Sequence, residues 1–387
     1  MSEQEPTVRE RVVELLNTAA FLHSEKEKIA TLDKVQELII HLDPQLLDSF
    51  FEDVAAFHKD RNSDVLKFVV GFIEEACKKD LAMLPRLVPN MQLLVMDEAV
   101  SVVKRVVQAV VQLHRATLAW LAAARTTTPE MEQVWHIITT MKNTILTMID
   151  HDNYGVRTQA IKFLEAMVLL QTYTEPDSVT REGEFNLDHV PLTLKVARPR
   201  KLEEEAKMVL GKLLAFQGSI HISSVNLMTC MSSLTIIARA RPQFLGKVVN
   251  ALEILHANLP PTLTKSQVNS VRKHLKIQMI NLLKHPASHY YHYNITTVLT
   301  DLGMSSSEIN KAMPSKDSMK RWIRRDKVGE EPVESAPKKP RIEKEEKKGK
   351  VEEPPAAVVE KTSALDITQR WLVENLSEWL LVFWSPG

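Results

Sequence analysis

The stretch DNYGVRTQAIKFLEA, residues 152–166, contains the pattern that decides the fold of this chain. Apolar side chains recur in it at steps of four and three residues, beginning with Val156, Ala160 and Phe163, so they share one face of a helix. A short acidic-polar lead precedes Val156, and Arg157 follows it. The stretch therefore predicts a helix that buries one face against neighbouring helices.

Two earlier stretches repeat the pattern weakly: SDVLKFVVGFIEEA at residues 63–76 and AVSVVKRVVQAVVQL at residues 99–113. Val65 and Val102 occupy the place of the first valine, 37 residues apart. Pattern and period resemble the second helices of HEAT repeats, although Leu66 stands where such repeats usually have an arginine. Helix pairs of this kind stack into a solenoid with a concave surface, because one pair cannot bury its apolar face alone.

The same periodicity continues to about residue 310, and the alternation typical of strands is missing from the sequence. We therefore predict an all-α fold, a HEAT/ARM-like right-handed α-solenoid followed by a disordered charged tail. The expected helices lie at residues 7–22, 27–41, 44–58, 63–78, 80–95, 99–124, 129–149, 153–172, 201–216, 221–240, 242–257, 264–284 and 288–302.

Three segments are expected along the chain: a helical repeat domain at residues 7–312, a linker at 313–362 and a tryptophan-rich end at 363–387. The linker is rich in Lys, Glu and Pro and poor in large aliphatic residues, so we expect it to be disordered. Within the repeat domain, residues 174–200 contain three prolines and one glycine. An irregular connection is predicted there.

Composition restricts the possible functions. The chain is 44% hydrophobic, and its formal net charge is zero, so nucleic-acid binding would need a local basic patch. Cys77 and Cys230 lie in apolar helical patterns and are expected in the core, not in a disulfide or a zinc site. Neither a signal peptide nor an apolar run long enough to cross a bilayer is visible, so an intracellular protein is expected.

The sequence offers little for catalysis or metal binding. Glycine-rich phosphate loops, nucleophile elbows and zinc-ligand spacings are missing from it. His285, His289 and His292 recur at a helical spacing, but Pro286 interrupts the backbone between the first two. We expect no catalytic residue, no metal site and no cofactor, and the chain is not expected to be an enzyme.

Basic side chains on the repeat helices are better candidates for binding a partner. Lys162 lies almost opposite the apolar face of its helix and is the first candidate. The full set predicted to bind a partner is Lys162, Arg157, Lys104 and Lys67. For each of them, a merely solvated helix surface is the competing interpretation.

The stretch NLPPTLTKSQVNSVRKHLKIQMINLLKHPAS, residues 258–288, predicts a second basic surface. Thr264 and Gln267 have the spacing of a capping box at the start of a helix. The basic patch on this helix consists of Lys265, Arg272, Lys273 and Lys276. It is a candidate for contact with phosphate, an acidic protein or RNA, and a merely solvated surface is the competing interpretation. Aromatic residues interleaved with the basic ones, as single-strand binding favours, are missing here, so direct RNA binding is not expected.

The stretch APKKPRIEKEEKKGK, residues 336–350, places a short basic cluster, Lys338, Lys339 and Arg341, between prolines of the expected linker. Nuclear import receptors bind exposed clusters of this kind. The stretch KRWIRRDK, which starts at Lys320, could complete a bipartite signal. We predict nuclear import, with a soluble charged linker as the alternative.

Several strings resemble the N-terminal region of the symplekin family, scaffolds of messenger-RNA 3′-end processing. They are KVQELII, FVVGFIEEACKKD, AIKFLEA and ANLPPTLTKSQVNSVRKHLK with the following LLKHPAS, and the resemblance covers about residues 12–314. It implies a non-catalytic HEAT/ARM-like domain that binds, and is expected to stimulate, the serine phosphatase of the RNA polymerase II C-terminal domain. It also implies cleavage and polyadenylation factors as partners.

Symplekins continue for many hundreds of residues, so this chain is expected to be a short or truncated form without the regions that hold those factors. The resemblance implies the nucleus as location, and the cytoplasmic face of tight junctions as a second one. Two other functions stay open: an RNA-binding module that uses the Lys265–Lys276 patch, and a HEAT-like transport or junction adaptor.

Overall fold

The computed structural model of the protein describes residues 6–314, and every regular element within that range is a helix. A π-helical turn, Glu37–Leu42, extends the second helix, and short 3-10 turns join several others. The α-helices are α1 (Val8–Phe21), α2 (Glu25–Gln36), α3 (Leu47–Ala55), α4 (Ser63–Lys79), α5 (Leu84–Leu94), α6 (Val100–Ala123), α7 (Pro129–Thr147), α8 (Tyr154–Leu170), α9 (Pro199–Gln217), α10 (Ser224–Ala240), α11 (Leu245–Ala257), α12 (Lys265–Leu283), α13 (His292–Asp301) and α14 (Ser306–Ala312).

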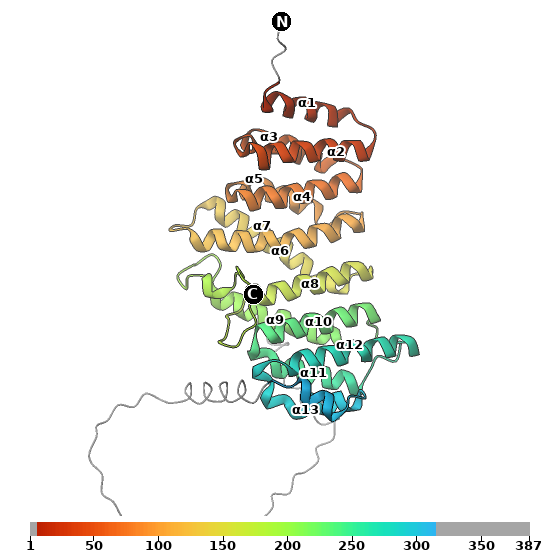
Figure 1. Ribbon diagram of the computed structural model, residues 1–387. Coiled ribbons are helices and arrows are strands. Elements are labelled where there is room, and N and C mark those ends of the chain that lie inside the picture. The colour runs from red at the N-terminus through yellow and green to blue at the C-terminus, as the bar shows by residue number, and fades with distance from the viewer. Residues whose placement is uncertain (1–5, 315–387) are drawn as a thin grey trace, which may run out of the picture. The chain divides into compact units, whose positions relative to one another are not determined.

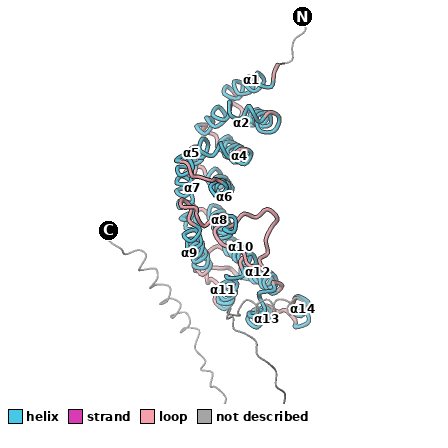
Figure 2. The backbone as a smooth tube through the Cα atoms, turned by 90° about the vertical axis from the view of Figure 1, so that its left-hand side faces the viewer, coloured by secondary structure: helices cyan, strands magenta, loops and turns pink. Residues whose placement is uncertain are grey.

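The helices form two layers (Figure 1). The even-numbered helices from α2 to α12 pack side by side in one layer, and the odd-numbered helices form the other. The stack is curved, with the even-numbered helices on its concave side (Figure 2). The predicted all-α, HEAT/ARM-like solenoid is confirmed, and each expected helix corresponds to one of α1 to α13. The right-handed sense of the superhelix stays a prediction.

The repeated valines explain the stacking. Val65, Val102 and Val156 stand near the starts of α4, α6 and α8, and all three are fully buried. Val102 and Val156 belong to one hydrophobic core that runs from α1 to α14, and Val65 packs in a small separate cluster with Ala19 and Leu32. Cys77 and Cys230 lie in this core as free thiols, as predicted, and burial raises the pKa of each to about 12.

The polar residues before the helices act as caps. Before α8, the Asn153 side chain accepts hydrogen bonds from the backbone N–H groups of Gly155 and Val156, at 2.9 and 3.2 Å. Before α12, Thr264 and Gln267 form the predicted capping box, in which each side chain accepts from the other residue's backbone N–H. Such caps satisfy donors that the first turn of a helix leaves free.

The connection between α8 and α9 is irregular, as predicted, and it is fixed to the stack at several points. Figure 2 shows it leaving the stack on the side of the even-numbered helices. Leu187, Val190 and Leu194 form a second small core with residues of α6, α7 and α9. Arg115 on α6 donates a hydrogen bond of 2.6 Å to the carbonyl of Gly183.

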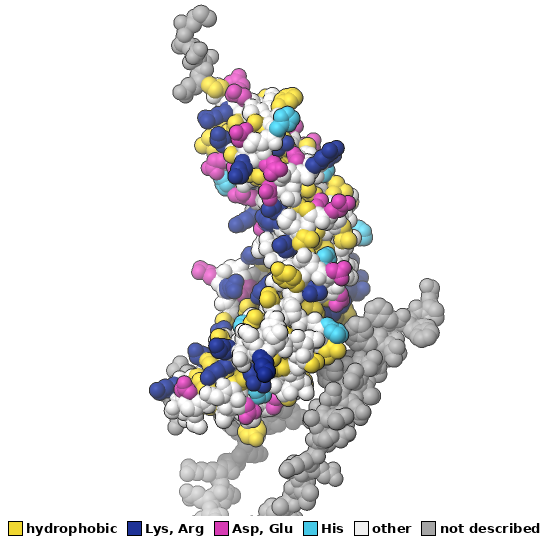
Figure 3. Space-filling view, turned by 90° about the vertical axis from the view of Figure 1, so that its right-hand side faces the viewer, with side chains coloured by type: hydrophobic (Ala, Val, Ile, Leu, Met, Phe, Trp, Pro, Cys, Tyr) yellow, Lys and Arg dark blue, Asp and Glu magenta, His cyan; other side chains and the backbone are white. Residues whose placement is uncertain are grey.

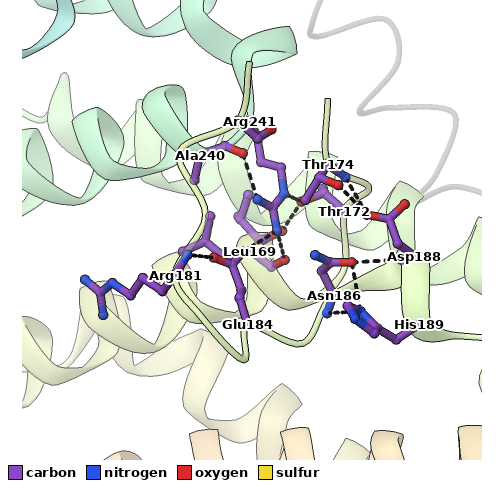
Figure 4. Close-up of polar contacts among 12 residues, drawn as sticks. Leu169, Thr172, Thr174, Arg181, Glu184, Asn186, Asp188, His189, Ala240 and Arg241 are labelled. Carbon is purple, nitrogen blue, oxygen red and sulfur yellow. Dashed lines mark hydrogen bonds and ion pairs between the residues drawn. The ribbon is translucent and has the colours of Figure 1, made fainter. Parts of the chain in front are cut away.

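Arg241, directly after α10, holds this connection from the inside (Figure 4). Its side chain is completely buried. The guanidinium donates to the Leu169 carbonyl at 2.7 Å and to Thr172 Oγ1 at 2.9 Å. It also forms an ion pair of 2.9 Å with Glu184. One side chain therefore joins the ends of α8 and α10 to the connection between α8 and α9.

Several sequence predictions fall on residues that the structure does not describe. Apart from residues 313 and 314, the predicted linker lies outside the described range, and so do the tryptophan-rich segment and the basic cluster at Lys338, Lys339 and Arg341. Among the helices that are described, none has both the length and the apolar character needed to cross a membrane.

Candidate functional site

The concave layer contains all four residues predicted to bind a partner. Lys67 lies on α4, Lys104 on α6, and Arg157 and Lys162 on α8. These three helices are neighbours in the layer, and all four side chains are partly exposed. The structure thus brings the four residues to one face, and binding through them stays a prediction.

Lys162 is partly exposed on α8 and forms an ion pair on its own helix. Its side chain is 42% exposed, and its Nζ lies 2.7 Å from a carboxylate oxygen of Glu165, one turn further along α8. A partly exposed ion pair within one helix contributes at most about 1 kcal/mol. Glu165 is only 14% exposed, so Lys162 would keep this partner and donate a second hydrogen bond to a carboxylate or carbonyl group of a bound protein, because an ammonium group has three donors.

Lys67 and Lys104 differ in their surroundings. Lys67 is 37% exposed and pairs with Asp64 on its own helix at 2.6 Å. The Lys104 side chain reaches from α6 to the start of α8, where the missing side chain of Gly155 leaves it room. Both ammonium groups remain near the surface of the concave layer.

Arg157 makes its contacts inside the stack. Its Nε donates to Asn226 Oδ1 on α10 at 3.2 Å, and its Nη1 donates to the His151 carbonyl at 3.0 Å. Asn226 is itself fully buried, and its amide donates to Tyr154 O and Thr158 Oγ1. We therefore expect Arg157 to position α8 against α10, and not to bind a partner on its own.

Similar polar contacts link other neighbouring helices of the concave layer. They were not predicted, because each pair joins residues roughly 30 to 50 positions apart. They are Glu74 with Arg105 at 2.7 Å, Gln108 with Gln159 at 3.1 Å, and Ser232 with His274 at 2.8 Å. These pairs add polar contacts between neighbouring helices of the concave layer to those of the apolar core.

The predicted basic patch lies on α12, the last even-numbered helix of the concave layer. Lys265, Arg272 and Lys273 are exposed, and Lys276 is half-buried. Within residues 6–314, none of the four forms an ion pair. The patch is therefore open to an anionic partner.

The histidines near the end of α12 have structural contacts. His285 is buried, and its Nε2 lies 3.0 Å from the carbonyl of Asp177 in the connection between α8 and α9. Burial lowers the pKa of both His285 and His292. In the described part of the chain, no group of three or more His, Cys, Asp or Glu side chains is placed to hold a metal ion.

Comparison with known proteins finds a relative in fission yeast. This chain is similar to the mRNA cleavage and polyadenylation specificity factor complex subunit pta1 of Schizosaccharomyces pombe, with 22% identity over 166 residues. The matched region is 41% of this chain and 25% of pta1. The chain thus spans about a quarter of the length of that relative.

Two engineered proteins are similar among solved structures. The first has 16% identity and a TM-score of 0.35, and the match covers 71% of this chain and 96% of the engineered one. The second has 13% identity and a TM-score of 0.23, with 82% and 93% covered. Both scores are low, so neither likeness supports any part of the fold assignment.

The match to a family model assigns this chain to a family. The model described as Symplekin/PTA1 N-terminal matches residues 99–321, which is more than half of the chain. The matched range includes Lys104, Arg157, Lys162 and the whole α12 patch, while Lys67 lies before it. The resemblance to symplekins is confirmed, and this chain belongs to the Symplekin/PTA1 N-terminal family.

Proposed function

We propose that this chain is a scaffold of pre-mRNA 3′-end cleavage and polyadenylation, and that its concave face binds the serine phosphatase of the RNA polymerase II C-terminal domain. Symplekin/PTA1 proteins are non-catalytic scaffolds of the cleavage and polyadenylation machinery, which agrees with the expectation that this chain is not an enzyme. The name of the pta1 relative, a subunit of a cleavage and polyadenylation complex, supports factors of that complex as further partners.

The position of Lys162 is the observation that supports phosphatase binding. It lies on α8, which has α4 and α6 on one side of it in the concave layer and α10 and α12 on the other. A globular partner in the concavity would cover Lys162 and exclude water from it. A charge-assisted hydrogen bond gains strength when water is excluded, because the local dielectric constant falls.

Replacing Lys162 with alanine is expected to weaken phosphatase binding by about 1.5 to 3 kcal/mol, roughly 10- to 150-fold, because a desolvated charge-assisted hydrogen bond is lost. The fold should be unchanged, since no buried apolar group is removed. Titration calorimetry with the purified phosphatase measures the affinity, and the phosphatase rate in the same mixtures measures the proposed stimulation.

Lys207→Ala is the matched control for Lys162→Ala. Lys207 is also a helix lysine in an ion pair on its own helix, with Glu203 at 2.9 Å, and its side chain is 53% exposed. It lies on α9, in the other layer. We expect Lys207→Ala to bind the phosphatase like the wild type. Equal affinities of Lys162→Ala and wild type would show that Lys162 is only a solvated surface residue.

A nuclear location is the second part of the proposal, supported by the polyadenylation role of the family and by the basic cluster of the linker. Replacing Lys338, Lys339 and Arg341 with alanine in a fluorescent fusion should lower the ratio of nuclear to cytoplasmic fluorescence, because an import receptor loses its charged contacts. Alanine at Lys344, Lys347 and Lys348, in the same linker, is the control and should leave the ratio unchanged.

Nuclear accumulation that persists when Lys320 and Arg321 are replaced as well would exclude this import signal. No contact among residues 6–314 favours a role as a transport adaptor or a junction adaptor.

A further inference from the structure

The end of the helical stack has an unusual distribution of charge. Between Glu253 and Asp301 the sequence contains five lysine and arginine residues and no aspartate or glutamate. Elsewhere in the described range, eight lysine and arginine side chains form ion pairs with carboxylates, whereas none from this segment does. Lys276 lies near Glu308 of α14, and the other four cations of the segment have no carboxylate partner among the described residues.

The exposed surface of α12 consists almost entirely of hydrogen-bond donors. In Figure 3, Lys and Arg side chains gather at the lower left, at the height of α12. The exposed residues of α12 are Lys265, Ser266, Asn269, Ser270, Arg272, Lys273 and Ile277. Only Ile277 among them lacks a polar side chain.

Three of the cations lie in a row along one side of α12. Arg272 is seven residues beyond Lys265, and Lys276 is four residues beyond Arg272, which is close to two turns and one turn of helix. With a rise of about 1.5 Å per residue, the steps along the helix axis are about 10 and 6 Å. Lys273 lies beside this row. An extended chain of phosphates can follow such a line of cations.

The exposed side chains of α12 itself favour a phosphate backbone over a protein as its partner. Protein interfaces depend on apolar or aromatic anchors that become buried, and α12 offers only Ile277 for this purpose. Lysine, arginine, serine and asparagine are the side chains that contact phosphates. We propose that α12 binds the phosphate backbone of single-stranded RNA through Lys265, Arg272, Lys273 and Lys276.

The missing aromatic residues define how such RNA would bind. Since α12 itself has no Phe, Tyr or Trp, bases have nothing on this helix to stack on, so the contact would be electrostatic and independent of sequence. Missing aromatic residues disfavour base stacking only, and phosphate contacts do not need them. This RNA site is separate from the proposed phosphatase site around Lys162, so each can be tested without the other.

The test is a fluorescence-anisotropy titration of labelled oligouridine with the full chain, in which Lys338, Lys339 and Arg341 are replaced with alanine in all proteins compared. This common background removes one basic cluster of the linker as a competing site, and the basic stretch at residues 320–327 is the same in all proteins compared. The decisive variant is Lys265→Glu, Arg272→Glu and Lys273→Glu. Lys276 is kept, because it is half-buried and lies near Glu308 of α14.

The triple variant should bind oligouridine at least about tenfold more weakly than its parent. The slope of log affinity against log salt should become shallower by about 2, since each phosphate contact to a single strand contributes about 0.7 to it. Exchanging oligouridine for oligoadenosine should change neither result.

Arg200→Glu, Lys201→Glu and Lys212→Glu form the matched control. These residues are exposed, lie on α9 in the other layer, and give the same change in charge. The control should keep the affinity of the parent.

If both triple variants lose affinity equally, or if neither does, α12 is not the site. If polyglutamate binds α12 as tightly as oligouridine does, the surface is one for acidic proteins and the RNA proposal is wrong. Should the glutamate variant melt at a lower temperature, the three alanine substitutions replace it in the same titrations.

Discussion

Replacing Arg241 with methionine should lower the free energy of unfolding by about 3 to 5 kcal/mol, the range typical of removing one partner from a buried ion pair. Methionine keeps an unbranched apolar side chain but cannot donate a hydrogen bond. The Leu169 carbonyl and Thr172 Oγ1 each lose a donor. The Glu184 carboxylate loses its charged partner and, among the described residues, keeps only the backbone N–H of Arg181. Glu184 is 18% exposed, so it has little water available to replace the guanidinium.

Arg115→Met tests whether the burial of Arg241 causes this effect. Arg115 is exposed and donates one hydrogen bond to the same connection, at the Gly183 carbonyl. Its replacement should cost no more than about 1.5 kcal/mol, the net value of one hydrogen bond. Urea unfolding of both variants supplies the numbers. A loss for Arg241→Met no greater than that for Arg115→Met would contradict a central role of Arg241.

A second substitution separates two causes of the lost stability: the unpaired carboxylate charge of Glu184 and the hydrogen-bond acceptors left without a donor. Glu184→Gln removes the carboxylate charge that Arg241 neutralises. If the unpaired charge causes most of the loss, the double variant should be more stable than Arg241→Met alone. If the loss comes mainly from the backbone carbonyl and the Thr172 hydroxyl, Glu184→Gln should not restore stability.

The helical stack was predictable because its signals are local. Val65, Val102 and Val156 were recognised from neighbours within a few positions, and the requirement to bury them recurs in each repeat. The cap at Thr264 was predictable for the same reason, since Gln267 stands three residues away. The short helix α14 was not among the predicted elements. Its seven residues include one buried side chain, Ile309, which is too few to show a period.

Contacts between distant residues were not predictable from the sequence. An arginine in a sequence is expected at the surface, yet Arg241 is completely buried. Its partners Leu169 and Glu184 precede it by 72 and 57 positions. The prolines of the connection between α8 and α9 indicated an irregular path, but nothing local to that connection indicated that a later arginine holds it.

In the candidate site too, features set by neighbouring residues were predictable, and contacts between distant residues were not. The helix face of Lys162 followed from the spacing of the apolar residues around it, and the structure places this lysine partly exposed on the concave layer. Arg157 is adjacent to the same pattern, but its side chain is directed to Asn226, 69 positions later. Only the packing of α8 against α10 distinguishes a lysine open to a partner from an arginine used within the stack.

Acid should destabilise the protein through His114, a residue whose role the sequence did not reveal. His114 lies in α6, is completely buried, and has no hydrogen-bond partner for either ring nitrogen among the described residues. Its ring packs against Trp135, with centroids 5.2 Å apart. Burial, with a smaller effect from the positive charge of Lys142, lowers the pKa of His114 from 6.5 to about 3.

The direction of the pH effect follows from these two pKa values. Between about pH 6.5 and pH 3 the unfolded chain binds a proton at His114, and the folded protein does not. The unfolded state therefore gains stability as pH falls, by about 1.4 kcal/mol for each pH unit below 6.5. Above about pH 6.5 His114 takes nothing from the free energy of unfolding. At pH 5 that free energy should be about 2 kcal/mol lower through this residue alone.

His114→Leu isolates this contribution from the other groups that titrate in the same range. Leucine binds no proton in either state, so the free energy of unfolding of the variant, relative to wild type, should rise by about 2 kcal/mol between pH 7 and pH 5. Urea unfolding at both pH values measures the difference. His136→Leu is the control, because His136 is exposed on α7 and its replacement should leave the pH dependence of the wild type. If His114→Leu loses stability with acid as steeply as the wild type does, the folded protein accepts a proton at His114, and the imidazole is not held neutral by burial.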